Sequence, residues 1–97
     1  MAKKEYLWVK DIADSKRVGL TKEGQEALGK VKFVDLPMIG KEISKGDSTG
    51  SVEAQKAVVE LQSPVAGKIV TVNDKLNDDP ELLNGSESDA WLFEVNK

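Results

Sequence analysis

Two residue types are missing from this 97-residue chain, which contains no histidine and no cysteine. Without histidine it lacks the side chain that most often moves protons near neutral pH, which excludes Ser-His and Cys-His catalysis and imidazole metal ligands. Without cysteine it has no thiolate nucleophile, no thiolate ligands for zinc or iron–sulfur clusters, and no disulfide. Any chemistry in which the chain takes part must therefore be supplied from outside, and we expect no metal site.

Basic and aromatic residues are also few. The chain carries 14 Lys and Arg against 17 Asp and Glu, Arg17 is its one arginine, and aromatic residues make up 5%. Nucleic-acid binding usually needs a basic patch with stacking aromatics, so we expect no nucleic-acid partner. No apolar run reaches the roughly 18 residues of a membrane span, and the charged first ten residues differ from a signal peptide. We therefore expect no membrane association and a cytoplasmic location.

What the sequence does contain is a series of short apolar segments separated by turn residues. Strands are predicted at residues 6–9, 17–20, 31–36, 58–62, 67–72 and 90–95, with a turn at 13–16 and a further extended segment that starts at Ser51. A spacing of about ten residues is typical of a β-sandwich or flattened barrel. Since no linker or repeat interrupts the pattern, we expect a single domain over residues 1–97.

Two short helices complete the predicted secondary structure. Thr21 suits the N-cap position of a helix over residues 22–28, and Gly29 suits the position just after its end. A second helix, of one or two turns, is predicted between a capping Asp79 and the Asn-Gly stop at residues 84–85.

Residues 53–57 lie between two predicted strands, at a hairpin turn that directs Lys56 into solvent. A lysine at such a turn is usually a solvated charge that protects a strand edge. The chain has 13 lysines, since one of its 14 basic residues is Arg17. The pattern alone therefore does not single out Lys56.

A resemblance to a known family does single it out. Residues 50–57, Gly-Ser-Val-Glu-Ala-Gln-Lys-Ala, and residues 63–67, Ser-Pro-Val-Ala-Gly, resemble the lipoyl-attachment stretch of the glycine cleavage H-protein family. The resemblance covers nearly the whole chain and extends to residues 8–9, 18–21, 25–29, 33–37, 40, 46, 72–73, 80–84 and 91–92. An ordered set of this size is far more specific than a Lys-Ala dipeptide.

The resemblance implies a mainly β fold, a flattened β-sandwich of the lipoyl and biotinyl carrier type with one or two short helices. It implies that lipoate is joined to Lys56 through an amide bond, and that the modifying enzyme recognises Glu53 and Gly67. The residues themselves leave simpler roles open, Glu53 as a cross-strand partner on a solvated face and Gly67 as a turn residue. Biotin is the competing modification, but biotinyl lysines usually stand between methionines, whereas Lys56 stands between Gln55 and Ala57.

In the family that the chain resembles, the carrier is not itself an enzyme. Its lipoyl arm carries the aminomethyl group and reducing equivalents between a pyridoxal-phosphate glycine decarboxylase, a folate-dependent aminomethyltransferase and dihydrolipoamide dehydrogenase. A lipoate ligase or lipoyltransferase attaches the arm, whose cyclic disulfide would supply the redox chemistry that a chain without cysteine lacks. We expect a monomer that meets basic partner surfaces, because Asp35, Glu53 and Glu60 are acidic.

The sequence departs from the family pattern in three places. Tyr6-Leu7 replaces the family's His-Glu, residues 85–90 replace its Asp-Pro-Tyr-Gly loop, and the chain ends at Lys97, where the family usually continues into a C-terminal helix. Two further interpretations therefore stay open beside a carrier of glycine cleavage. One is an H-like carrier that serves lipoate relay to 2-oxoacid dehydrogenases or redox-linked ADP-ribosylation, and the other is an unmodified interaction module.

Overall fold

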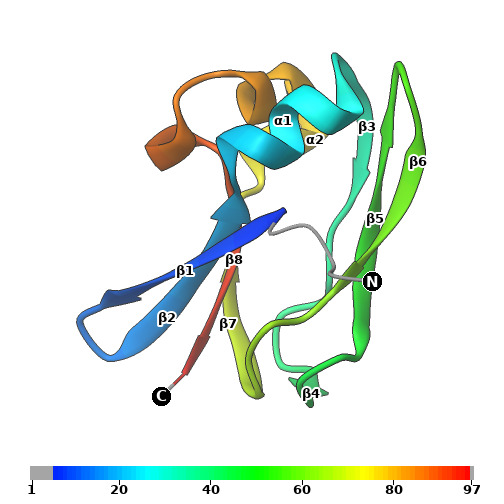
Figure 1. Ribbon diagram of the computed structural model, residues 1–97. Helices are drawn as coiled ribbons and strands as arrows, with labels where there is room; N and C mark the ends of the chain where they lie inside the picture. Colours follow the sequence, from blue (N-terminus) through cyan, green and yellow to red (C-terminus); the bar gives the residue numbers. More distant parts are fainter. Residues whose placement is uncertain (1–5, 97) are drawn as a thin grey trace.

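The computed structural model describes residues 6–96, which form short strands, α-helices and 3-10 segments (Figure 1). In chain order the elements are β1 (Leu7–Ile12), β2 (Ser15–Leu20), α1 (Lys22–Leu28), β3 (Val31–Asp35), β4 (Glu42–Ile43), β5 (Ser48–Ala54), β6 (Val58–Gln62), β7 (Gly67–Val72), α2 (Lys75–Asp78), η1 (Pro80–Asn84), η2 (Glu87–Asp89) and β8 (Trp91–Asn96).

The strands form two antiparallel sheets. The larger sheet has the order β1-β2-β8-β7-β4, and the smaller sheet has the order β3-β5-β6. Figure 1 shows the two sheets as separate layers, with α1, α2 and the 3-10 segments gathered at one end. The predicted mainly β sandwich with few short helices is confirmed.

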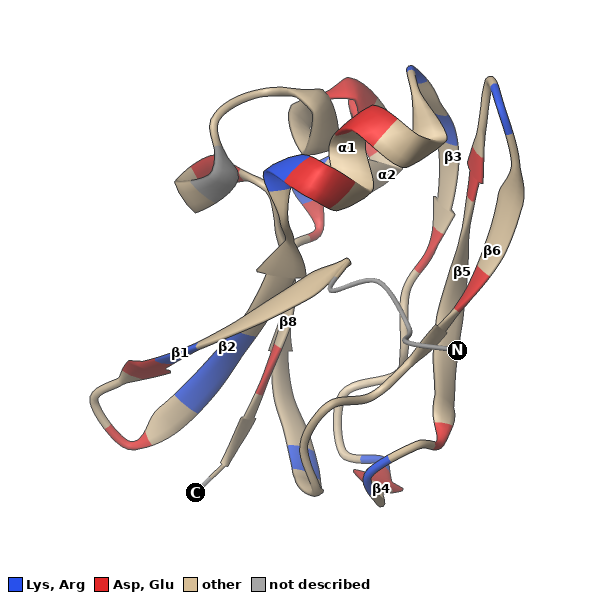
Figure 2. Ribbon diagram, in the orientation of Figure 1, with Lys and Arg blue, Asp and Glu red and all other residues tan. Residues whose placement is uncertain are grey.

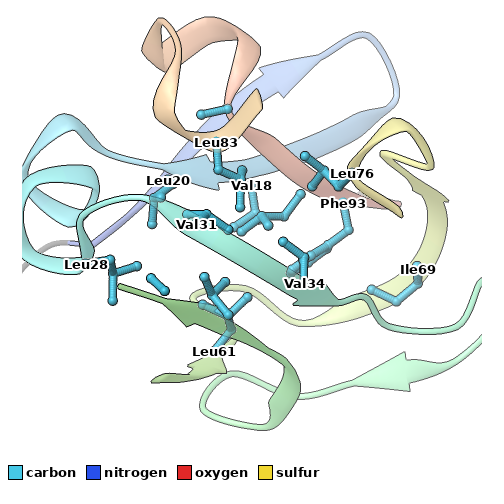
Figure 3. Packing of buried hydrophobic residues seen from close by; sticks show 14 of the residues in the cluster. Val18, Leu20, Leu28, Val31, Val34, Leu61, Ile69, Leu76, Leu83 and Phe93 are labelled. Atoms are coloured by element: carbon cyan, nitrogen blue, oxygen red, sulfur yellow. The ribbon is translucent and has the colours of Figure 1, made fainter. Parts of the chain in front are cut away.

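A cluster of buried apolar side chains fills the space between the sheets (Figure 3). Val34 and Val52 face each other across the small sheet, while Val18 and Phe93 face each other across the large one, and all four are at most 5% exposed. Full burial of a side chain of this kind stabilises the fold by about 1.5–3 kcal/mol. The other members of the cluster are Leu20, Leu28, Val31, Ile43, Ala54, Leu61, Ile69, Leu76, Leu83, Ala90, Leu92 and Val95.

Helix α1 has the predicted bounds, and both of its ends have the predicted chemistry. The Thr21 hydroxyl oxygen accepts a hydrogen bond from the Gly24 N–H at 3.0 Å, which satisfies one of the free donors of the first turn. At the other end Gly29 has a φ of 75°, and its N–H donates to the Gln25 carbonyl oxygen at 2.9 Å. Because L side chains rarely adopt this φ, glycine is well suited to end the helix there.

Strands β6 and β7 also have the predicted bounds, but the other strands differ from the prediction. The first hairpin turns through only Ala13 and Asp14, since Ile12 already pairs with Ser15, so β1 and β2 are longer than expected. Strand β3 stops one residue early and β8 is shifted by one residue. Strand β5 begins at Ser48, because pairing with β6 extends through polar residues that carry no apolar alternation.

Three short elements were not predicted. Strand β4 consists of two residues and is defined by its pairing with β7. Helix α2 lies where the sequence predicted no element, and segment η2 lies in the predicted loop before β8. The second predicted helix is the 3-10 segment η1, and Asp79 occupies its N-cap position, but the predicted capping by the Asp79 side chain is wrong, because that side chain makes no capping hydrogen bond. Instead its backbone N–H donates to the Lys75 carbonyl oxygen and closes α2.

Candidate functional site

The turn between β5 and β6 presents Gln55 and Lys56 at its tip. The hairpin closes below them through a hydrogen bond from the Ala54 N–H to the Ala57 carbonyl oxygen at 2.9 Å. Both tip side chains are exposed. The predicted turn with Lys56 at the surface is therefore confirmed.

The tip is docked onto the end of α1 and the start of β3, residues 28–31, which we call the α1–β3 turn. The Lys56 N–H donates to the Leu28 carbonyl oxygen at 3.0 Å, and the Gln55 N–H donates to the Lys30 carbonyl oxygen at 2.8 Å. Figure 1 shows this end of the hairpin beside the end of α1 and the start of β3. Two donors that a free hairpin tip would direct to water are thus bonded to the protein.

The Lys56 side chain lies along the last turn of α1. Its Nζ donates to the Glu26 carbonyl oxygen at 3.3 Å, and a Cβ on Gly29 would stand 3.3 Å from the Lys56 Cγ. The last carbonyls of a helix have no partner within the helix, and they favour a nearby cation. The absence of a side chain on Gly29 leaves room for the stem of Lys56.

Glu53 lies on the outer face of the small sheet rather than at the turn. It pairs with Phe33 on one side and with Val58 on the other, and all three side chains are exposed. Lys56 is bonded to the carbonyl oxygen of Glu26 and not to the Glu53 carboxylate. The position of Glu53 matches a cross-strand partner on a solvated face, and its recognition by a modifying enzyme stays a prediction.

The outer face of the small sheet is acidic. Asp35, Ser51 and Glu60 form the row next to that of Glu53, because Asp35 pairs with Ser51 and Ser51 pairs with Glu60. In an antiparallel sheet, directly paired and alternate residues lie on one face. We call this surface, with Phe33 and Val58, the acidic outer face; Figure 2 shows acidic segments on all three of its strands.

Gly67 lies at the start of β7, beside the end of β8. Its φ is 147°, and a Cβ there would stand 2.9 Å from the Asn96 carbonyl oxygen. The backbone of β8 thus approaches Gly67 closely, and a residue without a side chain leaves room for it. Figure 1 shows the start of β7 at the end of the sandwich away from α1, so the fold does not bring Gly67 to Lys56.

The sequence prediction missed two polar side chains behind the α1–β3 turn. Gln25 donates from its side-chain Nε2 to the carbonyl oxygens of Leu83 at 2.6 Å and Gly85 at 2.8 Å, which ties α1 to η1. Asn84 contacts the turn directly through its side chain. No local pattern could predict these contacts, because they join residues more than 50 positions apart. The sequence indicated a role for Gln25 and Asn84 only through the resemblance of their segments to the family.

A small antiparallel sandwich that presents an exposed lysine on a docked hairpin defines a carrier domain, in which a lysine bears a group that other proteins act on. The chain belongs to the glycine cleavage H-protein family, whose model, "Glycine cleavage H-protein", matches residues 1–97.

Individual relatives agree with this assignment. The chain is 43% identical over 93 residues to a glycine cleavage system H protein of Thermotoga maritima, covering 95% of this chain and 75% of that protein. It is 45% identical over 92 residues to the H protein of Geobacillus sp., covering 94% and 72%. Among solved structures, a glycine cleavage system H protein from Mycobacterium marinum matches with a TM-score of 0.86 and 36% identity, covering 97% of this chain and 80% of that one.

The family fixes the general role of the chain. Glycine cleavage H proteins are lipoyl carriers rather than enzymes, they hold lipoate covalently on a lysine, and they interact with the enzymes of the glycine cleavage system. Of the interpretations left open by the sequence, the relatives support the carrier of glycine cleavage, and they favour lipoate over biotin. Within residues 6–96, no helix is both long enough and apolar enough to cross a bilayer.

Proposed function

We propose that Lys56 is the lysine that bears the lipoyl group. The observation that carries this proposal is the docked hairpin tip: both tip N–H groups are held by the α1–β3 turn, while the Lys56 side chain stays exposed. A modifying enzyme would therefore meet a lysine whose backbone is already ordered, at little further entropic cost.

The surroundings of Lys56 suit acylation. Its Nζ donates to one backbone carbonyl oxygen, and among the described residues it has no carboxylate partner. Loss of the positive charge on acylation therefore leaves no carboxylate without a partner, which would otherwise be costly. In the reaction the Lys56 ammonium first loses a proton. The freed nitrogen lone pair then attacks the carboxyl carbon of an activated lipoyl group such as an acyl adenylate, the adenylate leaves with its bonding electrons, and a second proton leaves the nitrogen.

When attached, lipoate supplies a disulfide that opens to a dithiol, which is chemistry that no side chain of this chain can perform. The role of the protein is then to hold one end of an arm on the order of 10 Å long. The arm would receive an aminomethyl group from a pyridoxal-phosphate glycine decarboxylase, pass it to a folate-dependent aminomethyltransferase, and be reoxidised by dihydrolipoamide dehydrogenase.

The acidic outer face supports docking of basic partner surfaces beside Lys56. Three carboxylates, Asp35, Glu53 and Glu60, lie there with two exposed apolar side chains, Phe33 at 63% and Val58 at 70% exposure. Acidic patches of this kind speed encounter with basic surfaces, and the effect weakens with salt. A KM of the lipoate ligase for the carrier that does not rise with salt concentration would contradict this part of the proposal.

The remaining expectations belong to the same proposal. Recognition of Glu53 and Gly67 by the modifying enzyme, a single carrier domain over residues 1–97, a monomer and a cytoplasmic location all stay predictions. Fractionation of the native cells and light scattering of the purified chain test the last two.

The first experiment asks which lysine is modified. Lys56→Arg keeps the charge but removes the acylated amine, so we expect incubation with lipoate ligase to add one lipoyl mass to the wild-type chain and none to this variant. Lys30→Arg is the matched control, since Lys30 is an exposed lysine of the neighbouring α1–β3 turn whose ion pair with Glu81 an arginine can keep. A lipoyl mass on Lys56→Arg would refute the assignment of Lys56.

The second experiment tests the partner. The lipoylated chain, incubated with glycine decarboxylase, is expected to support exchange of labelled bicarbonate into glycine, whereas the apo chain and the Lys56→Arg variant are not. A lipoylated chain that supports no exchange would exclude glycine cleavage as its main role, even if Lys56 is the modified residue.

A further inference from the structure

Asn84 is the last residue of η1, and its side chain makes two hydrogen bonds to the α1–β3 turn. Its Nδ2 donates to the Gly29 carbonyl oxygen at 2.8 Å, and its Oδ1 accepts from the Val31 N–H at 2.8 Å. A residue of a neighbouring parallel strand bonds to an extended chain with the same pattern, to the carbonyl of one residue and the N–H of the next but one. The Asn84 side-chain amide thus bonds to the turn with the donor and acceptor pattern of a residue in a neighbouring strand.

The opposite side of the same turn holds the hairpin tip. The Leu28 and Lys30 carbonyl oxygens accept from the Lys56 and Gln55 N–H groups, at 3.0 and 2.8 Å. The turn leads into β3, an edge strand of the small sheet that pairs with β5 along one edge. The turn therefore bonds to the tip of the β5–β6 hairpin on one edge and to Asn84 on the other.

We propose that Asn84 is a positioning residue for lipoylation, which acts on Lys56 through the α1–β3 turn. The proposal rests on Lys56 being the lipoylated residue. Without the Asn84 amide, the Gly29 carbonyl and the Val31 N–H have no partner on that edge of the turn. The turn can then move, and the Lys56 backbone that bonds to its other edge moves with it.

Positioning and simple stabilisation predict different kinetics. A displaced acceptor amine reacts more slowly after binding, so kcat falls, whereas the docking surface and hence KM stay the same. If a variant is only less stable, its folded molecules are still lipoylated with the wild-type kcat. Displacements of about 1 Å can cost a catalysed reaction up to about a hundredfold, so we expect a loss of about tenfold for this indirect contact.

The test compares Asn84→Ala with Asn77→Ala in the full chain. Asn77 is an exposed asparagine of the neighbouring helix α2, and its hydrogen bonds to the residues that the structure describes involve only its backbone. With saturating lipoate and ATP, a limiting amount of lipoate ligase and a varied concentration of folded carrier, we expect kcat to fall about tenfold for Asn84→Ala, with KM for the carrier unchanged. For Asn77→Ala we expect kcat to stay at the wild-type value. If Asn84→Ala unfolds, Asn84→Asp is used, which keeps the acceptor for Val31 but removes the donor to Gly29.

Amide hydrogen exchange provides a second readout in the same variants. We expect the Gln55 and Lys56 amides of the Asn84 variant to exchange faster relative to the Ala54 amide, whose partner Ala57 lies within the hairpin. Equal acceleration of all three amides, or a kcat equal to that of Asn77→Ala, would overturn the proposal. Failure of the assignment of Lys56 is recognised separately, because the wild-type chain would then take up no lipoyl group at that residue.

Discussion

The molecule contains two tight hairpins, β1–β2 and β5–β6, and they are anchored in different ways. The β1–β2 tip extends away from the rest of the fold in Figure 1. Near it, Ser15 and Arg17 both donate to the carboxylate of Glu94 in β8, at 2.9 and 2.8 Å. The first hairpin is thus held along its side, by these side chains and by the pairing of β2 with β8, whereas the second is also held at its tip by backbone hydrogen bonds to the α1–β3 turn.

In the proposed function, this difference distinguishes Lys56 from a lysine at the other hairpin. Lys16 lies one residue beyond Ser15, at which the first turn ends, and pairs with Val95 of β8. Among the described residues, however, no backbone hydrogen bond from another element reaches Ala13 or Asp14 of the turn itself. Contacts along the strands stabilise a strand pair but do not hold its tip. Backbone anchors at the tip itself fix the direction in which Lys56 leaves the surface.

The largest expected effect concerns the first hairpin and sharpens this contrast. Gly19→Ala places a methyl group against the Trp8 ring and 2.6 Å from the Ala90 carbonyl oxygen. Neither the ring nor the backbone can move away easily, so we expect the free energy of unfolding to fall by about 3 kcal/mol. Urea denaturation followed by tryptophan fluorescence measures the loss.

The same variant also tests whether the two hairpins are independent. Because Gly19 belongs to the large sheet, whereas β3 and the β5–β6 hairpin form the small one, kcat for lipoylation of the folded carrier is expected to equal the wild-type value. Gly46→Ala, where φ is 95° and no atom lies within 4 Å of the new methyl group, controls for a loss of stability that arises from backbone strain alone. A lower kcat in Gly19→Ala alone would show that the large sheet also positions Lys56.

The second prediction concerns the contact between the α1–β3 turn and Lys56. Gly29→Ala forces an L side chain to adopt a φ of 75°, 3.3 Å from the Lys56 Cγ, so we expect a loss of stability of about 2 kcal/mol and a lower kcat for lipoylation. Gly40→Ala is the matched control, because its φ of 95° imposes similar strain with no atom within 4 Å. If both variants lose stability and both keep the wild-type kcat, the turn does not set the position of the lysine.

The parts of this arrangement that local sequence determines could be predicted, and the parts that depend on distant pairing could not. Helix α1 was predicted with its correct ends because Thr21 and Gly29 mark them within a few residues. Strand β4 was missed, since two residues carry no periodicity and only their pairing with β7 defines them. The resemblance to a family identified Lys56, but the contacts that dock its hairpin join residues 25 or more positions apart, and no local pattern encodes them.

The smallest expected effect concerns the acidic outer face, which lies on the small sheet and contains no residue of the first hairpin. Glu60→Gln removes one exposed charge from that face without changing the shape of the side chain, so we expect KM of the lipoate ligase to rise about twofold at low salt, with kcat unchanged. Glu42→Gln is the control, since Glu42 is equally an exposed glutamate but lies on β4 of the other sheet. The difference between the two variants should vanish at high salt, where exposed charges are screened. Equal KM values for both variants at low salt would mean that the partner approaches Lys56 from the side of α1 instead.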